Sequence, residues 1–483
     1  MADPTSIPAH VVIFPFPVQG HMNSMFKLSE LLCLAGIHVT YLVTVENHKR
    51  LVQNTNGVSW YDKYPGFRFQ MLPENISQGD GGQMKLFLNL YESLKTVKPF
   101  LMDLLVGKGQ TRPVTCLITD GLMKLTLDVG EETGVPVIYF RTASPCSVWT
   151  YFCLDKLIES RECPFGGGDD MDLPIKSVPG MEAFLRRRDL PSLFRVPDMG
   201  DTSFIRMFCM ETEQTVRAQG LILNTFEQLE GPIISQLRTK IPNIYTIGPL
   251  HAHLKARLEL ETTSSTMGFS NSLREEDMSC IKWLEEQPLK SVIYVSFGSL
   301  ATVTKEQLME FWYGLVNSGH RFLWVIRIDL LADNSDKKEV PKELEEGTKA
   351  RGYTVTWAPQ EEVLAHPAIG GFLTHSGWNS TLESIYEGVP MICWPYLADQ
   401  QINSRFVGEV WKLGLDIKDT CDRSSIEKAV RDLMEVRKEE FAKSAKEMAT
   451  VARKAVNEGG DSHNNLNKLV EGIKMMNVTA NRA

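Results

Sequence analysis

Short apolar runs alternate with amphipathic stretches along the first part of the chain. His10–Phe14 is a continuous apolar run that ends before a proline, which is typical of a buried strand that meets a loop. Apolar residues then recur at helical spacing over 25–35, and Gly36 is suited to end that helix. A second apolar run over 38–43 predicts another strand. The beginning of the chain therefore predicts a β-α-β unit.

The same alternation continues toward the C-terminus and predicts further strands. They lie at 114–119, 135–140, 220–224, 291–297, 322–326, 353–357, 371–374 and 390–394. The segments between them are amphipathic, and Thr304 and Gln307 have the spacing of a capping box at the start of one helix. Strands that alternate with helices predict parallel sheets covered by helices on both faces.

One stretch interrupts this alternation. Residues 251–279 are polar, charged and rich in Ser and Thr, with little periodicity, and we interpret them as a linker between two α/β domains. Near the end of the chain an apolar stripe over 464–475 follows Ser462, a candidate cap. We expect this last helix to pack on a domain.

Charge and cysteine content narrow the class of protein. The chain has 51 Lys and Arg against 60 Asp and Glu, a net charge of −9, which disfavours binding to nucleic acid. Nine scattered cysteines without CxxC pairs predict free thiols in a reducing compartment. No segment has the roughly 18 apolar residues of a membrane span. We therefore expect a cytoplasmic monomer without a membrane span.

The strongest chemical signal follows the strand at 371–374. That strand ends at His375, Gly377 makes a tight turn, and the next helix carries Asn379 and Ser380 in its first turn. A small-residue turn before a helix N-terminus presents free backbone N–H groups and the positive end of a helix dipole. The pattern predicts an anion cradle, most commonly for phosphate. The chain lacks the glycine fingerprints of dinucleotide and P-loop proteins.

Neighbouring residues would complete a nucleotide-sugar ligand. Trp357 ends a predicted strand, where an aromatic face would stack on a base. Glu383 lies four residues after Asn379 on the same helix and is suited to accept two ribose hydroxyls. Asp399 and Gln400 follow the next strand and offer acceptors and a donor to a polyhydroxylated ring. Each of these residues alone would more often be structural.

The segment 357–400 closely resembles the signature box of plant family 1 UDP-dependent glycosyltransferases. It matches at WAPQ, HSGWNSTLES and ADQ, and the likeness extends over the whole chain from PFPVQGH, residues 15–21. It implies an α/β GT-B fold of two Rossmann-like domains that face each other across a cleft. The implied parts are an acceptor-binding domain (1–250), the linker (251–279), a UDP-sugar-binding domain (280–460) and a C-terminal helix that returns to the N-terminal domain (461–483).

The resemblance also implies the donor site. Trp357 would stack on uracil, Ala358 and Gln360 would lie at the base and ribose, and Glu383 would hold the ribose hydroxyls. The diphosphate would be bound by Ser299, His375, Asn379 and Ser380, and the sugar would be contacted by Thr142, Trp378, Asp399 and Gln400. Gly20 and Gly377 belong to the same implied set, and Gln400 favours UDP-glucose. Ser376 stands where the family has Cys, a small change that we expect to leave donor binding unaltered.

A candidate base lies in the other half of the chain. His21 follows the first strand, where an imidazole is suited to remove a hydroxyl proton near neutral pH. From position alone, a surface or capping histidine would be the commoner reading. The match of PFPVQGH to the family motif implies that His21 is the general base. Asp120, at the end of the strand over 114–119, matches the acidic partner that orients the ring.

The resemblance therefore implies inverting transfer of glucose from UDP-glucose to a hydroxyl or carboxyl of a small lipophilic plant metabolite, with no metal required. Segments that are suited to line an apolar acceptor pocket contain Phe16, Phe87, Trp149, Phe204 and Met207.

Two alternative functions remain open from the residues. One is a metal-dependent glycosyltransferase that uses Asp170 and Asp172; the other is a non-catalytic nucleotide-sugar-binding protein, which would not need a base at position 21. The basic run of Arg186, Arg187 and Arg188 is either a solvated face or a contact for an anionic acceptor.

Overall fold

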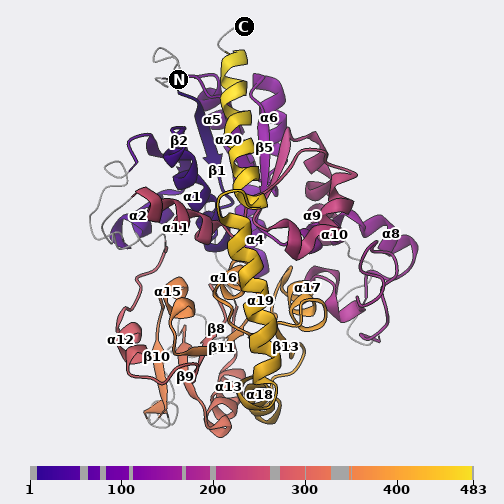
Figure 1. Cartoon of the computed structure of the whole chain (residues 1–483). Helices are drawn as coiled ribbons and strands as arrows, with labels where there is room; N and C mark the ends of the chain where they lie inside the picture. Colours follow the sequence, from indigo (N-terminus) through magenta and orange to yellow (C-terminus); the bar gives the residue numbers. More distant parts are fainter. Residues whose placement is uncertain are drawn as a thin grey trace. The chain divides into compact units, whose positions relative to one another are not determined.

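The computed structural model describes residues 8–54, 64–74, 76, 83–107, 112–165, 170–195, 203–261, 272–299, 301–327, 348–349 and 351–480. The chain divides into two compact units. Unit 1 comprises Met1–Phe152, Arg206–Arg274 and Ala455–Ala483, and unit 2 comprises Cys153–Ile205 and Glu275–Lys454. Each unit is built on its own sheet of parallel strands, as the alternation of strands and helices predicted (Figure 1).

The sheet of unit 1 has the strand order β3-β2-β1-β4-β5-β6-β7. Its strands are β1 (His10–Phe14), β2 (His38–Val43), β3 (Phe67–Met71), β4 (Cys116–Asp120), β5 (Val137–Arg141), β6 (Gly220–Leu223) and β7 (Ile244–Thr246). The ends of β1 and β2 lie where the sequence predicted them, because both strands are almost entirely buried. The sequence did not predict β3 or β7: β3 is a half-exposed edge strand, and β7 has three residues.

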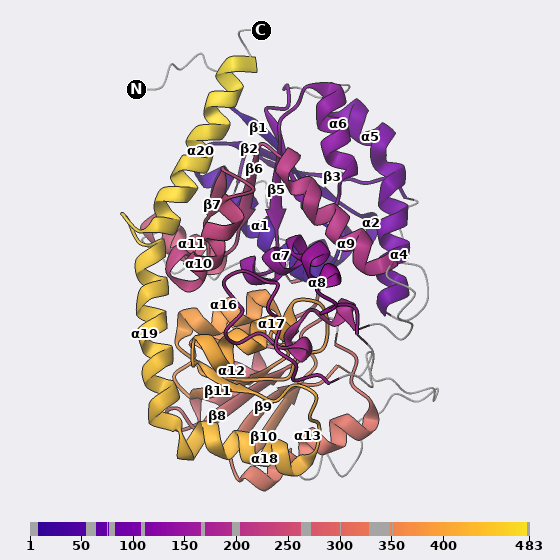
Figure 2. The same ribbon diagram turned by 90° about the vertical axis from the view of Figure 1, so that its right-hand side faces the viewer.

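Helices cover both faces of this sheet. They are α1 (Gln19–Leu34), α2 (Val45–Asn54), α4 (Gln83–Leu94), α5 (Lys98–Leu105), α6 (Leu125–Thr133), α7 (Pro145–Phe152), most of α9 (Ser203–Glu213), α10 (Glu227–Arg238), α11 (Leu250–Glu261) and α20 (Asp461–Ala480). The helices α1, α11 and α20 share one buried cluster with the sheet. In Figure 2 the pair α5 and α6 lies on the side of the sheet away from α20.

The C-terminal helix packs on the N-terminal sheet, as expected. Leu466, Leu469, Val470 and Ile473 of α20 are buried in the cluster that also contains side chains of β1 and β2. Burial of each such side chain contributes about 1.5 to 3 kcal/mol. Ser462 lies inside the helix rather than before it, and its hydroxyl donates to the carbonyl of Gly248 at 2.6 Å. The helix is thus attached to unit 1 by apolar packing and by this hydrogen bond.

The region interpreted as a linker is partly helical, which corrects the prediction. Helix α11 covers Leu250–Glu261 and packs on α1, with Leu250, Ala252 and Leu254 buried. The apolar stripe is short and lies directly before a long polar run, so the periodicity was not apparent in the sequence. Residues 262–271 of the expected linker lie outside the described residues, and residues 272–278 precede α12 (Ser279–Glu285) without forming a helix or strand.

The sheet of unit 2 has the strand order β10-β9-β8-β11-β12-β13. Its strands are β8 (Val292–Ser296), β9 (Arg321–Val325), β10 (Gly352–Val355), β11 (Ile369–Thr374), β12 (Met391–Cys393) and β13 (Gly414–Asp416). Its helices are α8 (Leu154–Glu159), α12 (Ser279–Glu285), α13 (Lys305–Ser318), α15 (Gln360–Ala365), α16 (Trp378–Glu387), α17 (Gln400–Arg405), α18 (Arg423–Arg431) and most of α19 (Lys438–Val456). The predicted capping box of α13 is present: Gln307 N donates to Thr304 Oγ1 at 3.1 Å, and Thr304 N donates to Gln307 Oε1 at 3.0 Å.

The segment Cys153–Ile205 groups with unit 2, although it lies within the range 1–250 that we expected to form the N-terminal domain. Apart from the start of α9, its described residues form the short helix α8 and the 3₁₀ turns η2 (Arg187–Asp189) and η3 (Ser192–Phe194). Because it has so little regular structure, its hydrophobic pattern does not indicate which sheet it packs against.

Two further expectations concern the whole chain. All nine cysteines are free thiols, as expected from their spacing. Among the described helices, none combines the length and apolarity that a membrane span requires.

We predict that acid destabilises unit 1 through His253. This side chain is fully buried, its Nδ1 lies 3.1 Å from the carbonyl oxygen of Ile247, and burial lowers its pKa from 6.5 to about 4. In the unfolded chain this histidine is protonated below about pH 6.5, whereas in the folded chain it is protonated only below about pH 4. The free energy of unfolding therefore decreases as the pH falls from about 6.5 to about 4.

At pH 5 the penalty amounts to about 2 kcal/mol. In His253→Asn, whose side-chain amide nitrogen takes the place of Nδ1 and is able to donate to Ile247, the loss of unfolding free energy between pH 7 and pH 5 should be smaller by that amount in urea titrations. An equal loss in both proteins would contradict the assignment.

Candidate functional site

His21, Asp120 and Thr142 meet at the carboxyl ends of β1, β4 and β5. His21 Nδ1 lies 2.5 Å from Asp120 Oδ2 and 3.0 Å from Thr142 Oγ1. The Asp120 side chain is 1% exposed, whereas that of His21 is 24% exposed. His21 lies in the first turn of α1, since this helix begins at Gln19 rather than near Asn23 as the apolar spacing predicted. The structure thus brings together the predicted base, its acidic partner and one predicted donor contact.

The contact with Asp120 bears on the tautomer of the His21 ring. The Asp120 side chain also accepts, at Oδ1, from the backbone N–H of Leu122 at 3.1 Å. A carboxylate accepts hydrogen bonds, so the contact at Oδ2 favours the tautomer that carries its hydrogen on Nδ1. In that tautomer Nε2 has the lone pair. An imidazole held in this form is prepared to take a proton at Nε2.

The sequence did not single out the residues that hold the turn after β4. Arg141 Nη1 donates to the carbonyl of Gly121 at 2.8 Å, and a Cβ atom on Gly121 would overlap the Arg141 side chain. Glu211 accepts from the Tyr91 hydroxyl at 2.5 Å and from the backbone N–H of Lys124 at 2.7 Å. Burial raises the pKa of Glu211. These contacts join α4, α9 and the turn that carries Asp120.

A row of stacked and tilted aromatic rings begins beside His21. The ring of Phe16 lies 5.6 Å from that of His21 and stacks on Phe87 at 4.8 Å, and Phe87 stacks on Phe208 at 5.3 Å. Tyr151 continues the array at 6.1 Å from Phe208. Of the predicted acceptor residues, Phe16 therefore lies next to the candidate base and Phe87 lies next to Phe16, whereas the sequence analysis missed Phe208 and Tyr151.

The other predicted acceptor residues lie on α7 and α9. Trp149 is buried in α7 with its ring 6.4 Å from Phe152, and Met207 is partly exposed on α9. The side chain of Phe204 lies outside the described residues. A signal for Phe208 was available in the sequence, because it follows Phe204 by four residues on one face of a helix.

A second cluster lies at the carboxyl end of β11 in unit 2. Gly377 is the N-cap of α16, and His375 precedes it at the strand end. A Cβ atom on either Gly377 or Gly298 would overlap Nε2 of His375, so two glycines make room for this ring. Gly298 also has a φ of +71°, which favours glycine. Burial lowers the pKa of His375 to about 4, and the ring is therefore a neutral donor at physiological pH.

Gln360, Ser380 and Glu383 converge beside this helix N-terminus. The amide nitrogen of Gln360 donates to Glu383 Oε2 at 2.6 Å and to Ser380 Oγ at 2.9 Å. The Tyr294 hydroxyl donates to Gln360 Oε1 at 3.3 Å. Three of the predicted donor residues, on α15 and α16, are thus joined by direct hydrogen bonds.

Arg327, which the sequence analysis missed, connects two other predicted donor residues. Its guanidinium donates to the carbonyl of Ser299 and lies 5.9 Å from the ring centre of Trp357. Trp357 is partly exposed and lies two residues beyond β10, not within it as predicted. The neighbouring Ala358 is buried.

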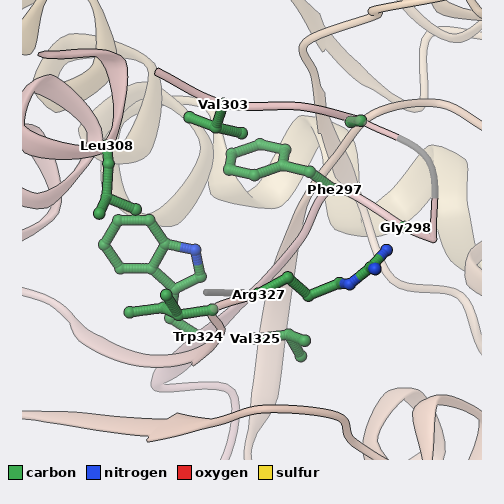
Figure 3. A pocket seen from close by; sticks show the side chains of 9 residues that line it. Phe297, Gly298, Val303, Leu308, Trp324, Val325 and Arg327 are labelled. Atoms are coloured by element: carbon green, nitrogen blue, oxygen red, sulfur yellow. The ribbon is translucent and has the colours of Figure 1, made fainter. Parts of the chain in front are cut away.

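A small pocket of about 30 Å³ lies against Arg327 (Figure 3). In the figure the Arg327 side chain extends toward Gly298, while Phe297, Val303, Leu308 and Trp324 form the apolar side of the pocket. The charged end of this pocket is therefore at the Gly298–Ser299 turn.

Asp399 and Gln400 lie on the turn that begins α17. Gln400 Oε1 accepts from the backbone N–H groups of Tyr396 at 2.8 Å and Leu397 at 2.9 Å, so its amide NH₂ is the end available to a ligand. Asp399 Oδ2 accepts from the amide of Asn403 at 2.9 Å. Trp378, predicted to contact the sugar, is only 4% exposed.

Two other predicted donor residues, Asn379 and Gly20, each lie in the first turn of a helix. Asn379 lies in the first turn of α16, as the sequence predicted. Gly20 lies in the first turn of α1, and a Cβ atom there would meet no atom within 4 Å. Space within the described residues therefore does not require glycine at position 20.

Asp172, Arg186 and Arg188 form part of an ion-pair network in unit 2, while Asp170 and Arg187 bond to backbone groups of the same unit. Both oxygens of Asp172 are engaged, by Arg186 at 3.1 Å and by Arg188 at 2.7 Å, and Asp170 Oδ1 accepts from the backbone N–H of Asp172 at 3.0 Å. Arg187 donates to the carbonyl of Arg161 at 3.4 Å. The arginine pairs disfavour the metal-binding reading of Asp172. In the part of the chain that the structure describes, no group of three or more His, Cys, Asp or Glu side chains is placed to hold a metal ion.

Comparisons with protein families match both halves of the chain. Residues 264–451 match the family described as UDP-glucoronosyl and UDP-glucosyl transferase, and residues 8–64 match the family described as glycosyltransferase, N-terminal domain. These ranges contain the predicted base and most of the predicted donor residues.

Individual relatives match over nearly the whole length. A 7-deoxyloganetic acid glucosyl transferase of Catharanthus roseus is 54% identical over 478 residues, which cover 98% of each chain. A myricetin 3-O-rhamnoside 1,2-glucosyltransferase of Crocosmia x crocosmiiflora is 43% identical, over 98% of this chain and 97% of the relative. Among solved structures, UGT2 of Phytolacca americana, complexed with UDP-2-fluoro-glucose and pterostilbene, matches with a TM-score of 0.78 at 28% identity, covering 96% of this chain and all of that chain.

The crowding of His375 by Gly377 gives a test of the anion cradle. In Gly377→Ala the new Cβ must displace the imidazole, although the φ of −60° itself permits alanine. We expect the affinity for UDP to fall about tenfold, measured by calorimetry, because one charge-assisted hydrogen bond is lost. Gly231→Ala is a matched control, since a Cβ there meets no atom within 4 Å. Unchanged UDP affinity in Gly377→Ala would separate His375 from the nucleotide site.

Proposed function

The chain belongs to the plant family 1 UDP-glycosyltransferases and is a UDP-glucosyltransferase of the GT-B fold, and we propose that His21 is its general base, oriented by Asp120. The observation that carries this proposal is the contact between His21 Nδ1 and the buried Asp120 carboxylate at 2.5 Å, with Thr142 at 3.0 Å from the same atom. A protein that only bound a nucleotide sugar would not need this arrangement.

In the proposed reaction, Nε2 of His21 removes the proton of an acceptor hydroxyl. The oxygen attacks the anomeric carbon of UDP-glucose from the face opposite UDP, so the α-linked sugar becomes a β-glucoside. The resulting imidazolium is stabilised by Asp120 through the Nδ1–H hydrogen bond. A carboxylic acid is already ionised near neutral pH and needs no base. The oriented His21–Asp120 pair therefore favours a hydroxyl acceptor.

For the donor we propose the cluster on unit 2. The N-terminus of α16, with Asn379 and Ser380, and the neutral His375 meet the negative charge that develops on the departing diphosphate. Glu383 and Gln360 hold the ribose beside the exposed face of Trp357, and the Gln400 amide donates to a glucose hydroxyl. Because these groups stabilise the leaving group, the proposed reaction has no step that requires a metal.

We propose a small cyclic terpenoid as the acceptor. The relative named for 7-deoxyloganetic acid is 54% identical over 98% of this chain, ahead of the 43% identity of the relative named for a myricetin rhamnoside. The aromatic wall of Phe16, Phe87 and Phe208 beside His21 supports a lipophilic acceptor. The nine free thiols support work in a reducing compartment such as the cytoplasm, where we propose that the protein acts as a monomer.

Two substitutions test the catalytic pair. We expect His21→Ala to reduce turnover by roughly 100- to 10,000-fold, and Asp120→Asn by at least about 100-fold, because each disables proton removal. UDP affinity should stay within about twofold in both variants, since the donor cluster is unchanged. His48→Ala, which removes a ring packed on Phe69, is the matched control and should retain full turnover. Parallel loss of UDP affinity and turnover in His21→Ala would argue against a base.

An acceptor panel tests the substrate class. With UDP-glucose, 7-deoxyloganetic acid should have a higher kcat/KM than myricetin 3-O-rhamnoside or a simple phenol, by at least about tenfold, since a fitted pocket discriminates by a few kcal/mol. The product is identified by mass and by β linkage in NMR spectra. Turnover should be unchanged in EDTA. Loss of activity in EDTA that is restored by a divalent ion would favour the metal-dependent alternative.

A further inference from the structure

The turn that carries Asp399 and Gln400 is held by a distant part of the chain. The backbone N–H of Ala398 donates to the hydroxyl of Ser192 at 2.9 Å, and the backbone N–H of Ser192 donates to the carbonyl of Ala398 at 3.4 Å. Ser192 begins the 3₁₀ turn η3 in the segment Cys153–Ile205, which belongs to unit 2. Figure 2 shows this segment, in purple, running past α17.

Ala398 has a backbone conformation that needs such support. Its φ is +56°, a left-handed value that is unfavourable for a residue with a Cβ atom. A conformation of this kind persists only when surrounding contacts determine it. The two hydrogen bonds to Ser192 engage both backbone polar groups of Ala398. Ser192 therefore stabilises the left-handed conformation directly before Asp399.

The Gln400 side chain is oriented by the same turn. Its Oε1 atom accepts from the backbone N–H groups of Tyr396 and Leu397, which lie on the turn that Ala398 closes. A change in the turn would move these two donors and rotate the amide. The direction of the Gln400 NH₂ group thus depends on the conformation that Ser192 holds.

The segment is anchored by a buried ion-pair network. Asp189 is fully buried, and its carboxylate lies 2.9 Å from Arg186 Nε, 3.4 Å from Arg405 Nε and 2.6 Å from Lys418 Nζ. Arg405 is the last residue of α17, and it also donates to the carbonyl of Phe184 at 2.8 Å. The network thus attaches η2 to the far end of the helix that Gln400 begins. Both ends of α17 are held by the same segment.

Each basic side chain of this network is paired with a carboxylate, so we interpret the network as structural rather than as a site for an anionic ligand. Lys418 pairs with Asp416 as well as Asp189, at 2.6 Å each. Arg188 and Arg195 both pair with Asp419, at 3.2 and 3.4 Å. These pairings engage the basic side chains with carboxylates of the same unit.

We propose that Ser192 is a positioning residue for sugar recognition, acting on Gln400 and Asp399 through the turn at Ala398. The proposal rests on the proposed contact of Gln400 with the glucose of the donor. In this proposal Ser192 acts through the turn rather than through a contact of its own with the donor. It sets the direction of the Gln400 amide, so its loss weakens binding of the sugar while binding of the nucleotide is retained.

The test compares UDP-glucose with UDP, which lacks the sugar. In Ser192→Ala the KM for UDP-glucose should rise about fivefold, as expected for one lost hydrogen bond, while the inhibition constant of UDP stays within twofold of the wild type. The preference for UDP-glucose over UDP-galactose should fall. Ser192→Thr keeps the hydroxyl acceptor and should restore the wild-type KM.

Ser177→Ala is the matched control. Ser177 lies on the same segment, but its hydroxyl donates to Ser160 Oγ at 2.8 Å and is not bonded to the turn at Ala398, so its KM should be unchanged. Equal KM values for Ser192→Ala and Ser177→Ala would overturn the proposal, as would an equal rise in the KM of UDP-glucose and the inhibition constant of UDP. Absence of UDP-glucose turnover in the wild type, or an unchanged KM in Gln400→Ala, would instead contradict the proposed function.

Discussion

The register of the parallel strands is the constraint on which both clusters depend. In unit 1, Phe14 of β1 lies beside Thr119 of β4, and Asp120 of β4 lies beside Phe140 of β5. Adjacent strands therefore end at the same edge of the sheet, and the residues just beyond these ends meet there. A shift of one residue in β4 would turn Asp120 to the other face of the sheet and remove it from His21. The fold thus places the pair by backbone pairing, before any side-chain contact forms.

The same constraint operates in unit 2 with a different result. The strands β8 and β11 end side by side, so the turn at Gly298 and the turn at Gly377 both approach His375. Two glycines at these turns leave room for an imidazole whose pKa burial lowers to about 4. The proposed anion cradle therefore relies on a neutral ring and on oriented backbone N–H groups. Local hydrogen-bond donors of this kind are needed in a chain with a net charge of −9, because the overall field of the protein does not attract an anion.

The sequence predicted secondary structure most accurately where neighbouring residues along the chain determine it. The strands β1 and β2 were predicted to the residue because they are continuous apolar runs, and the capping box of α13 depends on two side chains three residues apart. The family motif indicated His21 and Asp120, 99 residues apart, which periodicity alone could not have paired.

The residues that were missed act through tertiary contacts. Arg327, Phe208 and Ser192 have ordinary local contexts, and their roles appear only when distant segments meet. The placement of Cys153–Ile205 with unit 2 was missed for the same reason, because its contacts are ion pairs and backbone hydrogen bonds without periodicity.

That placement has a consequence for recombining relatives of this chain. The chain passes from one unit to the other four times along the sequence. A chimera with a single junction near residue 250 would therefore not exchange complete units. In such a chimera the C-terminal half would come from one relative, and the segment that contains Asp189 would come from the other. Lys418, only 4% exposed at its side chain, would then depend on whether the new partner offers a carboxylate at that place. A chimera that exchanges the whole of unit 2 must therefore take residues 153–205 and the C-terminal part of unit 2 from the same relative.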